Sequence, residues 1–293
     1  MPTIDFVLVG AAKSGTTSLH RYLGGHPGLF LPKAKELAFF YGKSLEARQH
    51  ELVSESYTGL RQGQKVGLTE ANMLMFEDVP QRIVEHNANA KALIILRNPI
   101  ERAYSSYLFG RVRGWETSQT FEEALERELN GELKSRKERI DFAHLEHGHY
   151  QQQIERFAAV LGRQNLMIML MEDLTDNPRD TLIKVFGWLG VEPSVKGIDY
   201  HRRYNVTSTE RFGLAKNARR MVPGSMRKYL RHRLSSENLR RLKRALNWLR
   251  EKDQVPLEKP PMRQEIRQFL RSYYAKRNAN LGALIGRDVS HWS

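Results

Sequence analysis

The chain has 293 residues, of which 40% are hydrophobic and 27% charged, and its formal net charge at pH 7 is +14. This composition is typical of a globular protein rather than a disordered one, and the lack of cysteine excludes disulfides, thiolate metal ligands and cysteine nucleophiles. Since no apolar run approaches the length of a membrane-spanning helix and the N-terminus lacks a signal-peptide pattern, we expect a cytoplasmic protein.

The first informative stretch is residues 6–20. Residues 6–9 are apolar and β-favouring, glycines follow at positions 10 and 15, and residues 16–23 have a helical pattern, which predicts a strand, a tight loop and a helix. Such a loop binds anions because the first N–H groups of the helix converge there, and Lys13 adds a full positive charge. A Walker A motif would have Lys where this chain has Thr16, so the loop need not hold a nucleoside triphosphate with magnesium. A glycine turn without a ligand is the alternative.

Residues 13–19, Lys-Ser-Gly-Thr-Thr-Ser-Leu, resemble the 5′-phosphosulfate loop of sulfotransferases, which use 3′-phosphoadenosine 5′-phosphosulfate (PAPS). This family transfers the sulfuryl group of PAPS to an acceptor hydroxyl and releases adenosine 3′,5′-bisphosphate. The resemblance implies that six residues hold the 5′ side of the donor: Lys13, Ser14, Gly15, Thr16, Thr17 and Ser18. It also implies that Lys13 stabilises charge during the transfer.

Residues 35–40, Lys-Glu-Leu-Ala-Phe-Phe, resemble a motif of heparan-sulfate-type sulfotransferases in which the Glu is the general base. The resemblance implies that Glu36 activates the acceptor and that Lys35 is its electrostatic neighbour. A hydrogen-bonding role for Glu36, or a surface Lys-Glu pair before two core Phe residues, are the alternatives. Two departures weaken the expectation of a heparan-like acceptor: Ala38 replaces a His, and the strand ending at Leu68-Thr69 lacks an acidic-Lys pair.

Strand and helix patterns alternate through the first 190 residues, and this order is typical of an α/β fold. Further strands are predicted at 29–32, 65–69, 92–96 and 166–170. Further helices are predicted at 44–62, 78–87, 98–113, 150–161 and 178–189, and another begins at the capping box of residues 120–123. We therefore predict a P-loop-like three-layer fold with a central parallel sheet flanked by helices. We expect one domain over residues 1–293, with a core at 1–200 and a basic, mainly helical extension at 201–293.

Residues 93–107 contain a second sulfotransferase-like motif. In the family, an Arg at a strand's end and a Ser eight residues later hold the 3′-phosphate of the nucleotide, and here these positions are Arg97 and Ser105. The planar guanidinium of Arg suits a phosphate, whereas a P-loop kinase would need an Asp at such a strand end to hold magnesium. Three more stretches resemble the family: residues 148–150, residues 170–174, and the ending at residues 284–292, which is similar to bacterial members.

The positive charge is concentrated in residues 202–250, which contain 15 Lys and Arg residues against two acidic residues. Leucines at 239, 242, 246 and 249 share one helical stripe with basic residues around it, which is typical of a helix that lies on an anionic membrane, binds an acidic substrate or packs on the core. A solvated basic surface is the remaining interpretation. Residues 202–207 are a candidate for the loop that closes over the nucleotide in this family. No nucleic-acid partner is expected, because no recognised module accompanies the charge.

Three histidines, at positions 144, 147 and 149, cluster before a predicted helix. They lack acidic residues at metal-ligand spacing, so we interpret them as ordinary polar residues and expect no metal. The sequence thus predicts a sulfotransferase that acts by in-line displacement on a carbohydrate or glycolipid hydroxyl, with aliphatic natural-product hydroxyls as the next candidates. A P-loop nucleotide kinase and a non-catalytic nucleotide-dependent module for anionic surfaces are the alternative functions.

Overall fold

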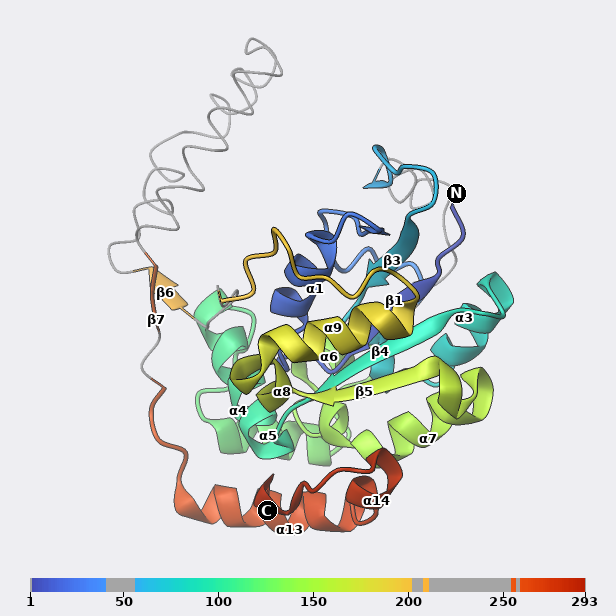
Figure 1. Ribbon diagram of the computed structural model, residues 1–293. Coiled ribbons are helices and arrows are strands. Elements are labelled where there is room, and N and C mark those ends of the chain that lie inside the picture. The colour runs from blue at the N-terminus through green and yellow to red at the C-terminus, as the bar shows by residue number, and fades with distance from the viewer. Residues whose placement is uncertain (1, 41–55, 202–207, 211–253, 257–258, 293) are drawn as a thin grey trace, which may run out of the picture. The chain divides into compact units, whose positions relative to one another are not determined.

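A computed structural model describes residues 2–40, 56–201, 208–210, 254–256 and 259–292 (Figure 1). The chain forms two compact units, which are residues 1–204 with 261–293, and residues 205–260. The expectation of a single domain over the whole chain stays a prediction. Most of the helix predicted at 44–62, the candidate nucleotide-covering loop at 202–207 and the leucine stripe at 239–249 lie outside the described residues.

The first unit alternates strands and helices along the chain. Its strands are β1 (Phe6–Gly10), β2 (Leu29–Phe30), β3 (Lys65–Thr69), β4 (Lys91–Leu96) and β5 (Leu166–Leu170). Its α-helices are α1 (Thr16–Gly24), α3 (Val79–His86), α4 (Pro99–Arg113), α5 (Phe121–Leu129), α6 (Arg136–Phe142), α7 (Tyr150–Leu161), α8 (Met171–Asp176), α9 (Pro178–Leu189), α13 (Gln264–Arg277) and α14 (Leu281–Ile285). Short 3₁₀ helices are η1 (Met73–Met75), η2 (Glu146–Gly148), η3 (Arg163–Asn165) and η4 (Ser290–Trp292).

The five strands form one sheet in the order β2-β3-β1-β4-β5, and every neighbouring pair is parallel. This arrangement confirms the predicted α/β fold with a central parallel sheet. Because the strands are parallel, their carboxyl ends all lie at the same edge of the sheet, with β3 and β4 on opposite sides of β1. The loops after β1, β3 and β4 therefore meet at one edge of the sheet.

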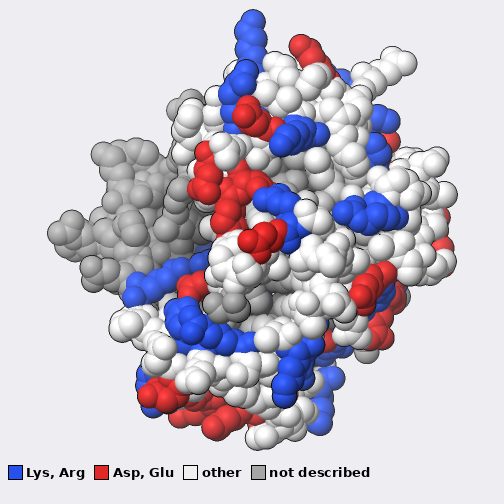
Figure 2. Space-filling view, turned by 60° about the horizontal axis from the view of Figure 1, so that its bottom comes forward, with Lys and Arg blue, Asp and Glu red and all other residues white. Residues whose placement is uncertain are grey.

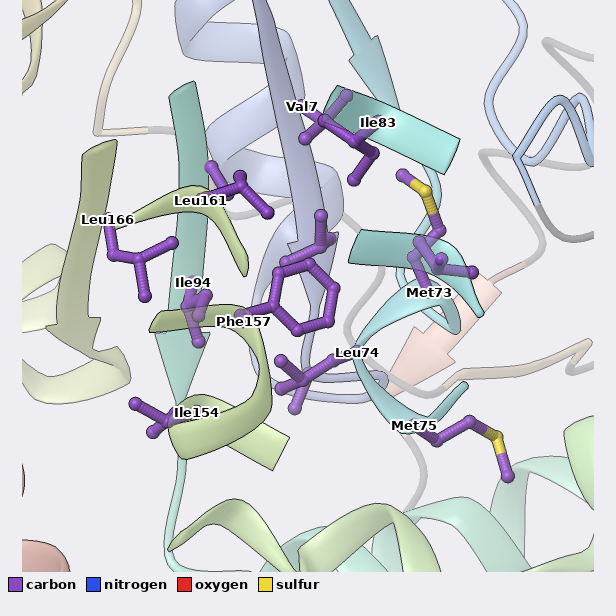
Figure 3. Packing of buried hydrophobic residues seen from close by; sticks show 14 of the residues in the cluster. Val7, Met73, Leu74, Met75, Ile83, Ile94, Ile154, Phe157, Leu161 and Leu166 are labelled. Atoms are coloured by element: carbon purple, nitrogen blue, oxygen red, sulfur yellow. The ribbon is translucent and has the colours of Figure 1, made fainter. Parts of the chain in front are cut away.

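Both faces of the sheet are buried, which explains the nearly uninterrupted apolar runs of its central strands. Val7 and Ile94 point to one face, where Phe157 of α7, Ile83 of α3 and η1 cover them (Figure 3). The alternate strand residues point to the opposite face, where they pack against α1 and α9. The helices thus form two outer layers around the sheet, as a three-layer fold requires.

Local signals that the sequence offered at helix ends are confirmed. The Asn98 side chain accepts hydrogen bonds from the N–H groups of Ile100 and Glu101 and so caps α4. Thr120 forms the predicted capping box, and Gly190 ends α9 in the left-handed conformation. Two short helices, α6 and α8, were not predicted; α6 buries none of its residues and therefore shows no apolar periodicity.

The chain beyond residue 200 is only partly helical where it is described. In the second unit, β6 (Ser208–Glu210) and β7 (Gln254–Pro256) pair in antiparallel orientation, so residues 208–210 and 254–255 are strands where a mainly helical segment was predicted. A strand pair of three residues on each side joins positions more than 40 apart, which no local pattern reveals. In the first unit, α13 and α14 confirm the helical prediction for residues 264–285.

The C-terminal residues 261–293 belong to the first unit, where α13 packs against α4 and α7. On the face that Figure 2 presents, Lys and Arg side chains are interspersed with Asp and Glu side chains over the described surface. None of the described helices is both long and apolar enough to cross a membrane.

Candidate active site

The loop after β1 lies between the chain segments that follow β3 and β4. The Ala11 N–H donates to the Ile95 carbonyl of β4 at 2.8 Å, and the Glu70 N–H donates to the Leu8 carbonyl of β1 at 3.0 Å. Gly10 has a φ of 149°, and a Cβ there would lie 2.8 Å from the Ala71 carbonyl oxygen. Only glycine therefore lets the loop pass this close to the end of β3.

The loop turns into α1 through two residues with left-handed backbone, Lys13 (φ 67°) and Gly15 (φ 94°). Gly15 is the N-cap of α1, and no side chain caps this end by a hydrogen bond. The first turn of α1 also contains no acidic residue, so nothing there opposes the positive end of the helix dipole. Ser14 and Thr16 are buried, whereas Lys13, Thr17 and Ser18 are half-buried. This geometry suits an anion at the start of the helix.

Lys35 joins this loop to the candidate base. Its Nζ donates to the Thr17 hydroxyl at 2.9 Å and to the Thr16 hydroxyl at 3.4 Å. The same Nζ lies 3.9 Å from Oε1 of Glu36. Burial lowers the pKa of Lys35, and the Glu36 carboxylate opposes that shift. The structure thus brings Lys35, Glu36, Thr16 and Thr17 together, although 18 positions separate Lys35 from Thr17.

Glu36 keeps its carboxyl group accessible while its backbone is fixed. Its side chain is 35% exposed, and partial burial raises its pKa, against the opposing effects of the Ala71 N–H and Lys35. The Glu36 N–H donates to the Thr69 carbonyl at 3.1 Å, and the Ala71 N–H donates to Glu36 Oε1 at 3.0 Å. Glu36 and Ala38 both have left-handed backbone, with φ of 59° and 56°. Such conformations cost free energy and persist where the surroundings fix them.

Glu70 fixes this segment from the interior, a role that sequence reasoning missed. Its Oε1 accepts a hydrogen bond from the Phe39 N–H at 2.7 Å, and its side chain is completely buried. Burial, with a smaller contribution from the nearby Glu36 carboxylate, raises the pKa of Glu70 to about 8 against the opposing effect of the Phe39 N–H. Glu70 is therefore mostly protonated at neutral pH.

We expect Glu70→Gln to change the pH dependence of stability. Between the ordinary Glu pKa of 4.5 and the folded value of about 8, the folded protein retains a proton that the unfolded chain has lost. Wild-type unfolding free energy therefore falls as pH rises through this window. Gln removes this loss of unfolding free energy, which is on the order of 5 kcal/mol at pH 8.5, and keeps an acceptor for the Phe39 N–H. Urea unfolding of both proteins at pH 5 and pH 8.5 measures the difference; an equal effect of the substitution at both pH values would contradict the assignment.

Arg97 directly follows β4 and points its guanidinium towards the loop after β1. Its Nη1 donates to the Lys13 carbonyl at 3.3 Å, which joins the two sulfotransferase-like motifs. Burial lowers the pKa of Arg97, with Glu101 opposing the shift. Ser105 is buried two helical turns into α4, so this helix fixes its position relative to Arg97.

The three other family-like stretches converge on Arg97. The Tyr150 hydroxyl donates to the Arg97 carbonyl at 2.8 Å. Asn98 Nδ2 donates to the Trp292 carbonyl at 3.2 Å, and the Trp292 indole N–H donates to Glu172 at 3.2 Å. The C-terminal residues therefore buttress the strand end that carries Arg97, a tertiary arrangement that spacing alone does not reveal.

The histidines at 144 and 147 are interior residues. His144 shares a hydrogen bond of 3.1 Å with the Glu116 carboxylate, and His149 shares one of 3.0 Å with the Tyr273 hydroxyl. Burial lowers the pKa of His147 to about 3 and that of His149 to about 4, so both are neutral at pH 7. Among the described residues, no group of three or more His, Asp and Glu side chains is arranged to hold a metal ion.

Comparison with known proteins identifies the family. The family model described as "Sulfotransferase domain" matches residues 3–247. The chain belongs to the sulfotransferase domain family. The crystal structure of a sulfotransferase from Alicyclobacillus acidocaldarius is similar, with a TM-score of 0.70, 24% identity, and coverage of 100% of this chain and 99% of that chain. This likeness shows that the sulfotransferase fold extends over the described core.

Two curated sulfotransferases illustrate the sequence similarity. Human heparan sulfate glucosamine 3-O-sulfotransferase 5 is 29% identical over 69% of this chain and 57% of its own length. Mouse bifunctional heparan sulfate N-deacetylase/N-sulfotransferase 4 is 27% identical over 98% of this chain and 31% of its own length. The chain therefore spans 57% of the length of the first relative and 31% of the length of the second.

Proposed function

We propose that the protein transfers the sulfuryl group of PAPS to a hydroxyl of an acceptor. The observation that carries this proposal is the contact of Lys35 with both the Thr16-Thr17 start of α1 and the Glu36 carboxylate, because it joins an anion-binding helix end to a candidate base. Family membership supports the reaction class. PAPS would supply the sulfuryl group and leave as adenosine 3′,5′-bisphosphate.

The residues around the loop fit the two charged ends of this donor. The start of α1 and Lys13 suit the 5′-phosphosulfate, since they offer N–H groups, hydroxyls and positive charge, and the first turn of α1 contains no acidic residue. Arg97 and Ser105 would hold the 3′-phosphate, for which a guanidinium fork is well suited. No metal is required in this proposal.

Glu36 would act as the general base. Its exposed carboxylate can accept the proton of the acceptor hydroxyl while the hydroxyl oxygen attacks in line. Lys35 and Lys13 would stabilise the negative charge that develops on the transferring and leaving oxygens. Protonated Glu70 supports this role, because it fixes the Glu36 segment without adding a second negative charge.

Carbohydrate or glycolipid hydroxyls are the acceptors we propose. The two relatives are named for heparan sulfate, which supports a glycan. The Glu-type base also favours this class.

We propose separately that the protein is cytoplasmic and that its basic residues 202–250 make peripheral contact with an anionic membrane. Co-sedimentation with anionic vesicles at low salt tests this second proposal. A protein that stays in the supernatant would contradict it.

A titration with adenosine 3′,5′-bisphosphate, compared with ATP plus magnesium, tests the proposal without an acceptor. We expect the bisphosphate to raise the melting temperature and to give a saturable calorimetric signal, because binding to the folded state stabilises it. A response to ATP and magnesium alone would favour a P-loop kinase instead. If neither ligand raises the melting temperature or gives a calorimetric signal, the donor-site assignment is overturned and a non-catalytic module is favoured.

A further inference from the structure

A buried histidine of α1, His20, connects this helix to the end of β3. Its Nδ1 shares a hydrogen bond of 2.9 Å with the hydroxyl of Thr69, the last residue of the strand. Both side chains are buried, and the two residues are 49 positions apart, so the pairing is visible only in the fold. The helix that begins at the anion-binding loop is therefore fixed to the carboxyl end of β3.

The two ring nitrogens of His20 have distinct roles. Burial, and to a smaller extent the charge of Lys35, lower the pKa of His20 to about 4, so the ring is neutral at pH 7 and carries a single N–H. The ring also hydrogen-bonds to the backbone of Pro32, which offers only a carbonyl acceptor. The N–H therefore donates to Pro32, and Nδ1 accepts the hydrogen bond of the Thr69 hydroxyl. With both nitrogens occupied, His20 is not itself a candidate general base.

The two partners of His20 hold opposite ends of residues 32–36, the segment that carries the candidate base. Pro32 is the first residue of this segment. At the other end, the Glu36 N–H donates to the Thr69 carbonyl at 3.1 Å. One imidazole thus connects both ends of the segment to α1.

The same helix also holds the middle of the segment. Lys35 Nζ donates to the hydroxyls of Thr17 and Thr16, at 2.9 and 3.4 Å. His20 lies three residues after Thr17 and four after Thr16, so the three side chains share one face of α1. The helix whose start would bind the phosphosulfate therefore supports the base segment along its side.

The backbone that follows Lys35 needs such support. Glu36 and Ala38 have φ of 59° and 56°, in the left-handed region that is unfavourable for residues with a side chain. Such conformations persist only where neighbouring groups fix them. The bond from the Glu36 N–H to Thr69 is one of these constraints, and His20 in turn fixes Thr69.

We infer that His20 is a positioning residue that sets the Glu36 carboxylate against the donor site by holding Thr69 and Pro32. In this role His20 contacts neither donor nor acceptor, so it affects turnover only through Glu36. A displacement of about 1 Å at a reacting group can lower the rate by about 10²-fold. The inference rests on the proposed function, in which Glu36 is the general base.

Two substitutions of His20 divide the contacts of the ring. In His20→Asn the amide oxygen takes the approximate place of Nδ1 and can still accept from Thr69. In His20→Gln the amide nitrogen takes the approximate place of Nε2 and can still donate to Pro32. We expect His20→Gln to lower kcat by about tenfold or more and His20→Asn to keep about half of the wild-type kcat or more. Turnover is measured as release of adenosine 3′,5′-bisphosphate from PAPS, with heparan sulfate as the acceptor probe.

A double-mutant cycle with Glu36→Gln separates positioning from a purely structural role. If His20 acts through Glu36, His20→Gln should lower kcat by less than about twofold once Glu36 has been replaced. A general loss of folded protein would instead lower kcat by the same factor in both backgrounds. That result, or wild-type kcat in His20→Gln, would overturn the inference.

His26→Gln is the matched control, because His26 is also a buried histidine with both ring nitrogens engaged. Its Nδ1 accepts from the Gly28 N–H at 3.0 Å, and its Nε2 lies 2.9 Å from the Glu192 carbonyl oxygen. This variant should keep kcat within about twofold of the wild type. Affinity for adenosine 3′,5′-bisphosphate should stay within about threefold in every histidine variant, since neither histidine is placed in the donor site.

Hydrogen exchange measured by mass spectrometry tests the same contact without an acceptor. We expect peptides within residues 33–40 to exchange about tenfold faster or more in His20→Gln, and at the wild-type rate in His20→Asn and His26→Gln. Unchanged exchange in these peptides would overturn the inference. Equally accelerated exchange along the whole chain would also overturn it, because that pattern reports global destabilisation.

The inference and the proposed function fail in different ways. If Glu36→Gln lowers kcat but His20→Gln does not, the base stands and the role of His20 is overturned. If Glu36→Gln keeps wild-type kcat, the proposed base is overturned, and faster exchange in His20→Gln would show only that the histidine holds the segment. If the wild type does not sulfate heparan sulfate, that acceptor is contradicted and the exchange experiment decides whether His20 fixes residues 33–40.

Discussion

Glu36→Gln is expected to lower kcat by about 10²- to 10⁴-fold, because the amide cannot accept the acceptor's proton. The amide oxygen can still accept the hydrogen bond from the Ala71 N–H, so the local backbone should be preserved. Affinity for adenosine 3′,5′-bisphosphate should stay within about twofold, since Glu36 is not placed in the donor site. Turnover is measured by bisphosphate release with the first acceptor that a glycan screen identifies.

The pH profile of the wild type adds a second readout for Glu36. Partial burial raises its pKa, so the acid limb of the kcat profile should lie above the ordinary Glu value of 4.5 and should vanish in Glu36→Gln. Glu85→Gln is the matched control, because Glu85 is an exposed residue of α3 that contacts Gln81. Wild-type turnover in Glu36→Gln would remove Glu36 as the base and leave it the hydrogen-bonding role.

Arg97→Ala is expected to weaken the binding of adenosine 3′,5′-bisphosphate by about 10²-fold or more, because a charge-assisted bidentate contact is worth about 3 kcal/mol. Its side chain donates to the Lys13 carbonyl, so removal also loosens the loop that would hold the 5′ side. Calorimetric titration measures the change in Kd. The free energy of unfolding should change much less, since the backbone of Arg97 remains held through Tyr150.

Arg97→Lys separates charge from geometry at this position. Lys keeps the charge but loses the planar fork, so we expect it to recover only part of the affinity. Arg179→Ala, an exposed cation in the first turn of α9, should bind the nucleotide normally. If Arg97→Ala bound the bisphosphate with wild-type affinity, the 3′-phosphate assignment would be wrong, even if Glu36 proved to be the base.

The sequence by itself determined the features that are coded locally. The apolar runs of β1 and β4, the glycines around Lys13 and the cap at Asn98 act over a few residues, so their patterns predicted the sheet, the anion-binding loop and the start of α4. Arg97 was assigned to the 3′-phosphate because residues 93–107 resemble the family motif, and the structure places it directly after β4. The helix α6 was missed because it buries no side chain and leaves no apolar period.

Tertiary structure alone decided which distant residues act together. Thr17 and Lys35 meet because β1 and β3 are neighbours, and Glu70 fixes the Glu36 segment across the same edge. The Lys13 ammonium lies over the Phe109 ring only in the folded chain, a contact between residues 96 positions apart. Desolvation also depends on the packed fold, so no local pattern could show that Glu70 holds its proton at pH 7 while Glu36 remains accessible.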